Sequence, residues 1–270
     1  MRGLLVAAGI CASIATTPAE RATRVSVHVA VEDQAGNPRE RLPAATFSLS
    51  VDGVVHPIDS VVPADQPLSV TVLVDDSPSM KPSAGRIEEA VKQFFAGLDA
   101  ADRRRVDKFG TGRGGSPLWD AIHRSVGLLA DQPGRRSLLV FTDGRASGNT
   151  HGLEDVAEFA VDRGVSLSAV VPDPPRGIRQ DAETMAVVTP AANLDRLAQY
   201  TGGVLLGGYN TTERPLQQLR DLAVRLRAGY TVSFVLPEPD TRRHRLEIRV
   251  ATPGLRMRAP MAFRVPGGIE

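Results

Sequence analysis

The chain has 270 residues, with 32 lysines and arginines against 31 aspartates and glutamates, which gives a formal net charge of +1. This balance excludes the strong positive field that attracts nucleic acid or an anionic membrane surface. The hydrophobic content of 42% is enough for a packed core, and the length fits one or two domains.

The N-terminal segment has the pattern of a secretory signal peptide. Arg2 gives a positive start, residues 4–15 form an apolar run, and small residues follow. The run is too short to span a bilayer stably. We expect residues 1–19 to be a signal peptide, cleaved after Ala15 or Ala19, and the protein to be periplasmic or secreted.

The only cysteine, Cys11, lies inside this segment. Lipoprotein processing is the alternative, but Ile10 stands where a small residue is expected. With ordinary cleavage the mature chain has no cysteine and forms no disulfide. No later segment is long and apolar enough to cross a membrane, so we expect no integral membrane segment in the mature chain.

Strand patterns follow in residues 20–67. Arg24 to Val31 alternates apolar and polar residues, as a half-buried strand does. Thr46 to Val51 and Val54 to Ile58 flank the dipeptide Asp52-Gly53, which is a hairpin signal.

The segment from Val70 to Met80, V-T-V-L-V-D-D-S-P-S-M, is the most informative in the chain. An apolar run rich in β-branched residues ends at Asp75, and Ser77 and Ser79 follow at two-residue steps. This spacing puts three oxygen ligands at the carboxyl end of a buried strand, where open α/β sheets bind ligands. Hard oxygen ligands suit Mg²⁺ or Mn²⁺ rather than zinc.

Two other segments supply the missing parts of such a site. Ser137 to Gly144, S-L-L-V-F-T-D-G, is a second buried strand that ends in an acid, Asp143. Gly114 to Ile122, G-G-S-P-L-W-D-A-I, offers a glycine turn and the hydroxyl of Ser116 at the start of a helix. The alternative is that these residues only form turns and helix caps. Three matching segments in the right order argue against it.

The middle of the chain alternates strands with helices, which favours a mainly parallel sheet covered on both faces. Helical spacing covers Arg86–Leu98, 118–129, Glu154–Arg163, Asn193–Tyr200 and Thr211–Arg227, and strands are expected at Val165–Val171 and Val204–Leu206. A polar loop rich in proline is expected at Pro172–Pro190. After Gly229, strands return at Tyr230–Leu236, Arg245–Val250 and Met257–Val265.

The strands at the two ends of the chain suggest an insertion architecture. Each group alone has too few strands to be stable, so the two groups should pair into one small β-sandwich. We expect β-sandwich parts at 20–67 and 229–270, with an α/β domain at 68–228 between them. The alternative is two separate β appendages.

These motifs resemble those of a von Willebrand factor type A (VWA) domain, which has a Rossmann-type α/β fold. The order of motifs over nearly the whole mature chain is similar to the VWFA-related family common in acidobacteria. The resemblance implies a metal-ion-dependent adhesion site (MIDAS) whose residues are Asp75, Ser77, Ser79, Ser116 and Asp143. In the family, the hydroxyls bind the metal directly and the carboxylates act largely through water. Ser116 stands where the family usually has Thr, and it lacks the methyl group that stiffens χ1.

One departure from the family lies between the first helix and Ser116. VWA domains usually carry a strand, an edge strand and a short helix in this interval, but only 102–115 is available here. Val106 and Phe109 are a remnant of the first strand at most. We expect a sheet smaller by one or two strands, with an exposed edge.

Other signals favour no catalytic or nucleotide site. Residues 110–115 match G-x-G-x-x-G, but Lys108-Phe109 is a poor strand and no suitable acid follows. The histidines lack metal-ligand spacing, and His151 is expected to be an exposed loop residue. No G-x-S-x-G elbow is present. Arginines at 242, 243, 245, 249, 256 and 258 are expected on a solvated face, and Trp119 in the core or at the rim of the site.

The sequence therefore predicts an exported, non-enzymatic protein that binds Mg²⁺ or Mn²⁺. The resemblance implies a protein partner that offers an exposed Asp or Glu to the metal. Two other functions stay open: a structural module in which metal only stabilises the fold, and an exported metal-dependent hydrolase.

Overall fold

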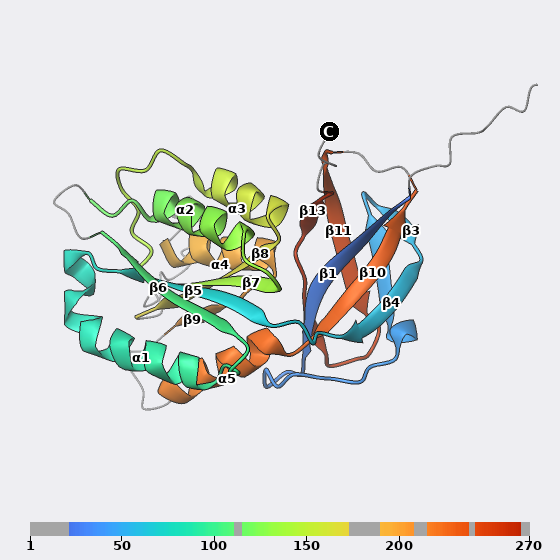
Figure 1. Cartoon of the computed structure of the whole chain (residues 1–270), viewed down its shortest axis with the longest axis horizontal. Coiled ribbons are helices and arrows are strands. Elements are labelled where there is room, and N and C mark those ends of the chain that lie inside the picture. Colours follow the sequence, from blue (N-terminus) through green and yellow to red (C-terminus); the bar gives the residue numbers. More distant parts are fainter. Residues whose placement is uncertain (1–21, 111–114, 173–189, 208–214, 238–240, 266–270) are drawn as a thin grey trace, which may run out of the picture.

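A computed structural model describes residues 22–110, 115–172, 190–207, 215–237 and 241–265 of the chain. An α/β region and an antiparallel β region lie side by side along the longest axis of the molecule (Figure 1). The structure confirms the predicted class, a parallel sheet flanked by helices together with a β-sandwich built from the N- and C-terminal strands. The predicted signal peptide and most of the loop at Pro172–Pro190 lie outside the described residues.

The α/β region is built on five strands in the order β6-β5-β7-β8-β9, and all neighbours are parallel. Their bounds are β5 Leu68–Asp75, β6 Arg103–Phe109, β7 Arg135–Phe141, β8 Val165–Val171 and β9 Leu205–Gly207. β5, β7 and β8 are the most buried strands because they lie inside the sheet and are covered on both faces.

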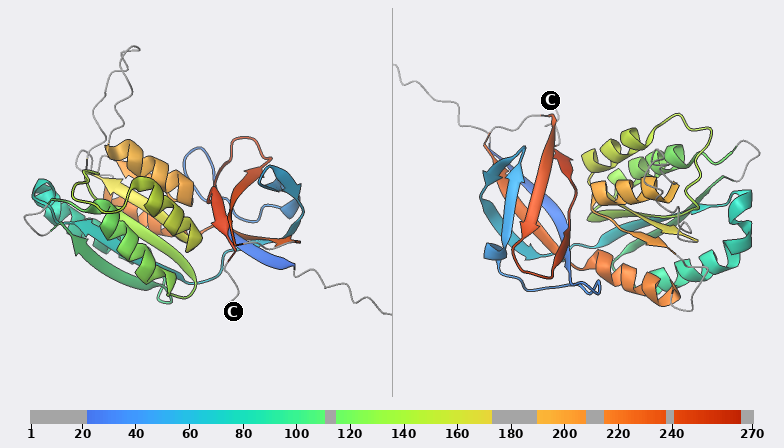
Figure 2. Two further views of the ribbon diagram at one scale, coloured as in Figure 1. Left: turned by 90° about the horizontal axis from the view of Figure 1, so that it is seen from above. Right: turned by 180° about the vertical axis from the view of Figure 1, so that it is seen from behind.

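Helices cover both faces of this sheet (Figures 1 and 2). Their bounds are α1 Ala84–Ala96, α2 Leu118–Ala130, α3 Leu153–Asp162, α4 Pro190–Thr201 and α5 Pro215–Arg227. The apolar stripes of α2, α3 and α4 pack on one face and those of α1 and α5 on the other, so the sheet separates two hydrophobic cores. The short 3₁₀ helices are η1 Ala44–Thr46 and η2 Pro78–Ser83.

The β-sandwich consists of two four-stranded antiparallel sheets, ordered β12-β1-β10-β4 and β13-β11-β2-β3. Their bounds are β1 Thr23–Glu32, β2 Phe47–Val51, β3 Val54–His56, β4 Ile58–Pro63, β10 Tyr230–Leu236, β11 Arg243–Val250, β12 Arg256–Arg258 and β13 Ala262–Arg264. N-terminal β1 pairs with C-terminal β10, and β2 with β11. Asp52 and Gly53 both have positive φ, which is the turn that the hairpin signal predicts.

Two strand predictions in the sandwich are wrong in their bounds. The single strand expected at Met257–Val265 is two short strands, and the segment crosses from one sheet to the other around Pro260, which has no N–H to donate to a ladder. The strand expected at Val54–Ile58 ends at His56, and β4 begins after Pro57.

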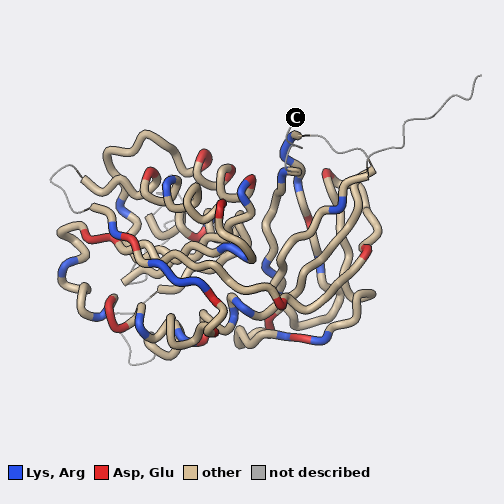
Figure 3. The backbone as a smooth tube through the Cα atoms, in the orientation of Figure 1, with Lys and Arg blue, Asp and Glu red and all other residues tan. Residues whose placement is uncertain are grey.

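The edge of the parallel sheet also differs from the prediction. A full strand, β6, pairs in parallel with β5 over seven residues, where the sequence indicated only a remnant. Its side chains are mostly exposed, and several of its own residues are basic (Figure 3). Because β6 has one neighbouring strand, its outer face needs no apolar pattern, and its charges discourage edge-to-edge pairing.

The chain passes between the two regions twice, through segments 64–67 and 228–229. These crossings lie side by side, because Ala64 N donates to Gly229 O over 2.9 Å. Gly229 has a φ of +130° and its backbone lies against Val29 O, so a side chain does not fit there. The boundaries 20–67, 68–228 and 229–270 stay predictions about separate folding units. None of the described helices is both long and apolar enough to cross a membrane.

Candidate functional site

The candidate site is centred on Asp75, the last residue of β5. Its side chain is only 1% exposed, because β5 lies between β6 and β7 and the chain folds back over the strand end. Oδ1 accepts a hydrogen bond from Ser77 N at 3.0 Å, and Oδ2 accepts one from Thr142 Oγ1 at 2.7 Å. A longer bond of 3.4 Å joins Ser116 Oγ to Oδ2. The carboxylate is thus fixed by its own turn and by two segments that are distant in sequence.

The serine hydroxyls gather around this carboxylate. Ser77 is 6% exposed and precedes η2, and its Oγ lies 3.2 Å from Ser79 Oγ. Ser79 is exposed, and Ser116 is 8% exposed. Pro78 at the first position of η2 favours the turn that brings the two hydroxyls to the same side. The structure therefore brings four of the five predicted residues together.

Asp143, the fifth predicted residue, lies at the edge of this cluster. It follows Thr142 at the end of β7 and is half-buried. Its Oδ1 accepts a hydrogen bond from Arg145 N at 3.0 Å, and Arg145 Nε lies 3.7 Å from Oδ2. Within the described ranges, no hydrogen bond joins Asp143 to the cluster around Asp75.

Close backbone approach at the site depends on Gly110. Its φ is +75°, and a Cβ built there lies 3.1 Å from Asp75 Oδ1 and 3.2 Å from Ser77 N. A side chain at this position would therefore press on the carboxylate and on the turn that holds it. Because residue 110 is glycine, the chain that leaves β6 can pass directly beside the site.

The position of Ser116 depends on Ser147 in the loop after β7. Ser116 N donates to Ser147 Oγ at 3.0 Å, and Ser147 N donates to Ser116 O at 2.9 Å. Gly115, with φ at +98°, leaves room for the Ser147 hydroxyl, which would lie 2.6 Å from an added Cβ. This two-way contact holds the start of α2 against the loop that follows Asp143.

A second contact ties the same loop to α2 further along. The Asp120 carboxylate accepts hydrogen bonds from the backbone N–H groups of Thr150 and His151, and His151 Nδ1 lies 2.7 Å from Oδ1. The Thr150 and His151 amides, followed by the His151 ring, lower the pKa of Asp120 to about 2. His151 lies in this loop, as predicted, but its side chain is only 37% exposed and its ring stacks on His123 with the ring centroids 3.9 Å apart.

The sequence motifs did not identify three residues that shape the site: Thr142, Gly110 and Ser147. Thr142 lies inside the T-D-G motif, and its position at the end of a buried strand is the signal that could have given it a role. Gly110 and Ser147 have no local signal, because their roles come from segments that meet only in the fold. Trp119 belongs to the hydrophobic core beneath α2, as favoured from the sequence.

The donor chemistry of this cluster fits a hard divalent cation. Carboxylate and hydroxyl oxygens converge, and among the described residues no Lys, Arg or His forms an ion pair with the buried Asp75. No group of three or more His, Cys, Asp or Glu side chains suited to a metal is found within the described ranges. The predicted set has two acids and three hydroxyls, so it contains too few acidic side chains to form a group of that type.

One signal that we set aside needs a correction. The G-x-G-x-x-G match at 110–115 does follow a strand, because β6 ends at Phe109. Residues 111–114 lie outside the described residues, and Gly110 lies against Asp75 rather than at the start of a helix.

Comparisons with known proteins give similarity of fold only. No protein-family model and no curated protein sequence matches the chain. Among solved structures, the chain is similar to the conserved hypothetical protein BatB from Bacteroides thetaiotaomicron, with a TM-score of 0.41 and 16% identity over 59% of this chain and 99% of that one. It is also similar to the human COPII-coat protein Sec24c, with a TM-score of 0.42 and 11% identity over 74% of this chain and 44% of that one. At these TM-scores neither similarity supports an argument about the site.

Proposed function

We propose that this chain is an exported protein whose VWA-like domain binds a partner protein through Mg²⁺ or Mn²⁺. The observation that carries the proposal is the buried Asp75 carboxylate, surrounded by hydroxyls and without a cationic side chain. A buried carboxylate without a charged partner is costly, and a bound cation removes that cost.

In this proposal the hydroxyls of Ser77, Ser79 and Ser116 are direct ligands, and Asp75 and Asp143 act through water. When bound, the metal supplies an open coordination position for an Asp or Glu oxygen of the partner. The chain's own contacts prepare the site: Thr142 orients Asp75, and Ser147 orients Ser116.

We propose binding rather than catalysis. Among the described residues, the groups that hydrogen-bond to Asp75 are hydroxyls and one backbone amide, and no histidine or second carboxylate that could share proton transfer is one of them. Export is a proposal from residues 1–19 alone. Sequencing the N-terminus of the protein secreted by its own cells would test cleavage after Ala15 or Ala19.

Calorimetric titration of Mg²⁺ and Mn²⁺ into the chelator-treated protein tests the metal site. We expect one saturable site that disappears in Asp75→Ala and in Ser77→Ala. Asp76→Asn is the matched control, because Asp76 is adjacent in sequence but pairs with Lys81 at 2.8 Å. Absence of binding by the wild type would refute the metal proposal.

The open coordination position needs a separate test. Water-proton relaxation by protein-bound Mn²⁺ should fall when acetate is added, because the carboxylate displaces a bound water. If the metal raises the melting temperature but acetate leaves the relaxation unchanged, the metal has a structural role and the binding proposal is wrong.

A further inference from the structure

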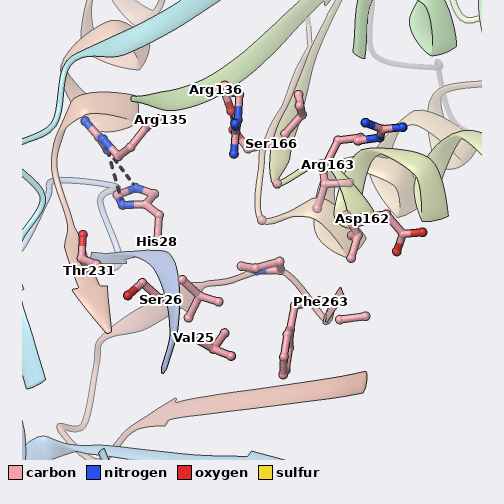
Figure 4. A pocket seen from close by; sticks show the side chains of 18 of the residues that line it. Val25, Ser26, His28, Arg135, Arg136, Asp162, Arg163, Ser166, Thr231 and Phe263 are labelled. Carbon is pink, nitrogen blue, oxygen red and sulfur yellow. Dashed lines mark hydrogen bonds between the residues drawn. The ribbon is translucent and has the colours of Figure 1, made fainter. Parts of the chain in front are cut away.

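A cavity of about 630 Å³ lies between the α/β region and the β-sandwich (Figure 4). Its walls come from β1 of the sandwich and from the first residues of β5, β7 and β8. The cavity therefore opens at the amino ends of the parallel strands, on the opposite edge of the sheet from Asp75. Cavities of this size at the junction of two regions are typical ligand sites.

The lining of this cavity is strongly basic. Asp162 is the single acid among the described lining residues, against arginines at 24, 135, 136, 163, 225, 258 and 264. Several of these arginines have acidic partners: Arg225 and Arg258 pair with Glu32, Arg24 pairs with Asp59, and Arg264 pairs with Asp162 of the lining itself. Arg135 and Arg136 have no such partner among the described residues.

The guanidinium of Arg136 has an unsatisfied hydrogen-bond donor and no acidic partner among the described residues. Its Nη1 donates to Ala130 O at 3.1 Å, while its Nε is buried without any hydrogen bond. Burial lowers its pKa, and no neighbouring carboxylate counters this effect. Its side chain lies on one wall of the cavity, between Arg135 on one side and Arg163 on the other (Figure 4).

Arg135 adds a second guanidinium to the same wall of the cavity. It donates to the carbonyl oxygens of Leu226 and Arg227, and its Nη1 lies 3.1 Å from His28 Nε2. Burial, together with the charges of Arg135 and Arg258, lowers the pKa of His28 to about 3, so this ring is neutral at pH 7. Arg135 and His28 thus form a polar wall without any acid.

The opposite wall is partly apolar and also carries the hydroxyls of Ser26 and Thr231 (Figure 4). Val25 and Phe263 lie across the cavity from the arginines (Figure 4). We propose that this cavity binds a small organic anion, with its carboxylate, sulfonate or phosphate group on Arg136 and its apolar body against Val25 and Phe263. Arginine suits this role because its planar fork binds such groups with two hydrogen bonds. The proposal is independent of the metal site.

A pair of fluorescent probes tests this on the full folded chain. One probe is 8-anilinonaphthalene-1-sulfonate, and the other is N-phenyl-1-naphthylamine, which has the same rings without the sulfonate. We expect one site that binds the sulfonate at least about tenfold more tightly, because a charge-assisted hydrogen bond is worth that much. Equal affinities for the two probes in the wild type would overturn the proposal.

Variants then locate the site. Arg136→Gln should weaken sulfonate binding at least about tenfold and leave the neutral probe unchanged, whereas Arg136→Lys, which keeps the charge but not the fork, should weaken it less. Arg249→Gln is the matched control, since this exposed arginine pairs, among the described residues, only with Glu247. Asp75→Ala should bind the sulfonate as the wild type does. If Arg136→Gln does not fold, Arg136→Lys and the probe pair still decide. Unchanged sulfonate affinity in the folded Arg136 variants overturns the proposal.

Discussion

The two ends of the parallel strands differ in charge and in origin. We call the side of the sheet where the strands end the carboxyl edge, and the side where they begin the amino edge. The carboxyl edge carries Asp75 and its hydroxyls, all of which come from the α/β region. The amino edge carries Arg135 and Arg136, and its wall is completed by the sandwich. One sheet thus presents an oxygen-rich edge, where we propose a cation, and a basic edge, where we propose an anion. The first edge is complete within its own region, whereas the second depends on the packing of the two regions.

The largest effect is expected at the junction beside the amino edge. Glu32 on β1 is 6% exposed and pairs with Arg225 on α5 and Arg258 on β12. Glu32→Ala leaves these half-buried cations without this partner and should lower the free energy of unfolding by about 3–5 kcal/mol. Urea denaturation measures this loss. In the exposed control Glu247→Ala the change should stay below about 1 kcal/mol, and equal losses in both variants would contradict the role given to Glu32.

The same residue predicts an acid dependence of stability. Burial alone would raise the pKa of Glu32, but the hydrogen bond from Arg225 and the charges of Arg258 and Arg225 lower it below its ordinary value. A lowered carboxyl pKa in the folded state stabilises above the ordinary value of about 4.5, and the contribution is lost as pH falls below it. Glu32→Ala should lose stability less steeply than the wild type in this range.

The carboxyl edge should respond differently, because its acid has polar partners rather than cations. Asp75→Ala should abolish metal binding and, in the presence of chelator, lower the free energy of unfolding by about 1–3 kcal/mol, because Ser77 N and Thr142 Oγ1 lose their acceptor. Asp75→Asn removes the charge but keeps one acceptor oxygen, so it should lose metal binding with a smaller loss of stability. Calorimetry and thermal unfolding together separate the two effects. Metal binding that survives in Asp75→Asn would contradict a charge-based site.

A smaller effect is expected from the glycine beside Asp75. Gly110→Ala forces a Cβ into a left-handed conformation and toward the carboxylate, so it should cost about 1–2 kcal/mol and weaken Mg²⁺ binding. Gly85→Ala is the matched control, because a Cβ there meets no atom within 4 Å and lies in α1. Its stability should be unchanged or slightly raised. Calorimetry measures the Mg²⁺ affinity of both variants. Equal affinities in Gly110→Ala and Gly85→Ala would contradict the link between Gly110 and the site.

The smallest effect is a change in pH slope at the amino edge. The folded pKa of His28 is about 3, below its ordinary value of 6.5, so the unfolded chain binds more protons between these values. Stability should therefore fall as pH drops below 6.5, and His28→Asn should flatten this fall. His123, whose pKa burial and the charge of His151 also lower, acts in the same direction. In denaturation experiments between pH 7 and 5, the double variant His28→Asn/His123→Asn should therefore show the smallest change of stability with pH. An unchanged slope in His28→Asn would contradict this account.

The comparison of the edges also explains what the sequence could predict. Asp75, Ser77 and Ser79 follow one strand at fixed spacing, so a local pattern was enough to place them together. Strands β8 and β10 have the predicted bounds because burial on the sheet makes the apolar pattern of β8 nearly continuous and that of β10 largely alternating. Asp143 was predicted from the same kind of pattern, but the direction of its side chain depends on Arg145 and the loop.

The rest depends on contacts that no local pattern contains. β6 has the charged sequence R-R-R-V-D-K-F, and only its ladder with β5 makes it a strand. Arg243 and Arg258 were expected on a solvated face, but both are half-buried and pair with Asp162 and Glu32. Their partners lie far away in sequence. The amino edge was therefore invisible to motif analysis.

The side-by-side crossings have a consequence for the order of folding. Pairing Val25 with Phe234 in the sandwich requires closure of a very long loop, whose entropic cost grows with loop length. If the α/β region forms first, it holds Ala64 and Gly229 one hydrogen bond apart and shortens that loop to the segments 25–64 and 229–234. The inserted region then acts as a template for the late, non-local pairing of β1 with β10. Pulsed hydrogen exchange during refolding should protect the amides of β5 and β7 before those of β1 and β10.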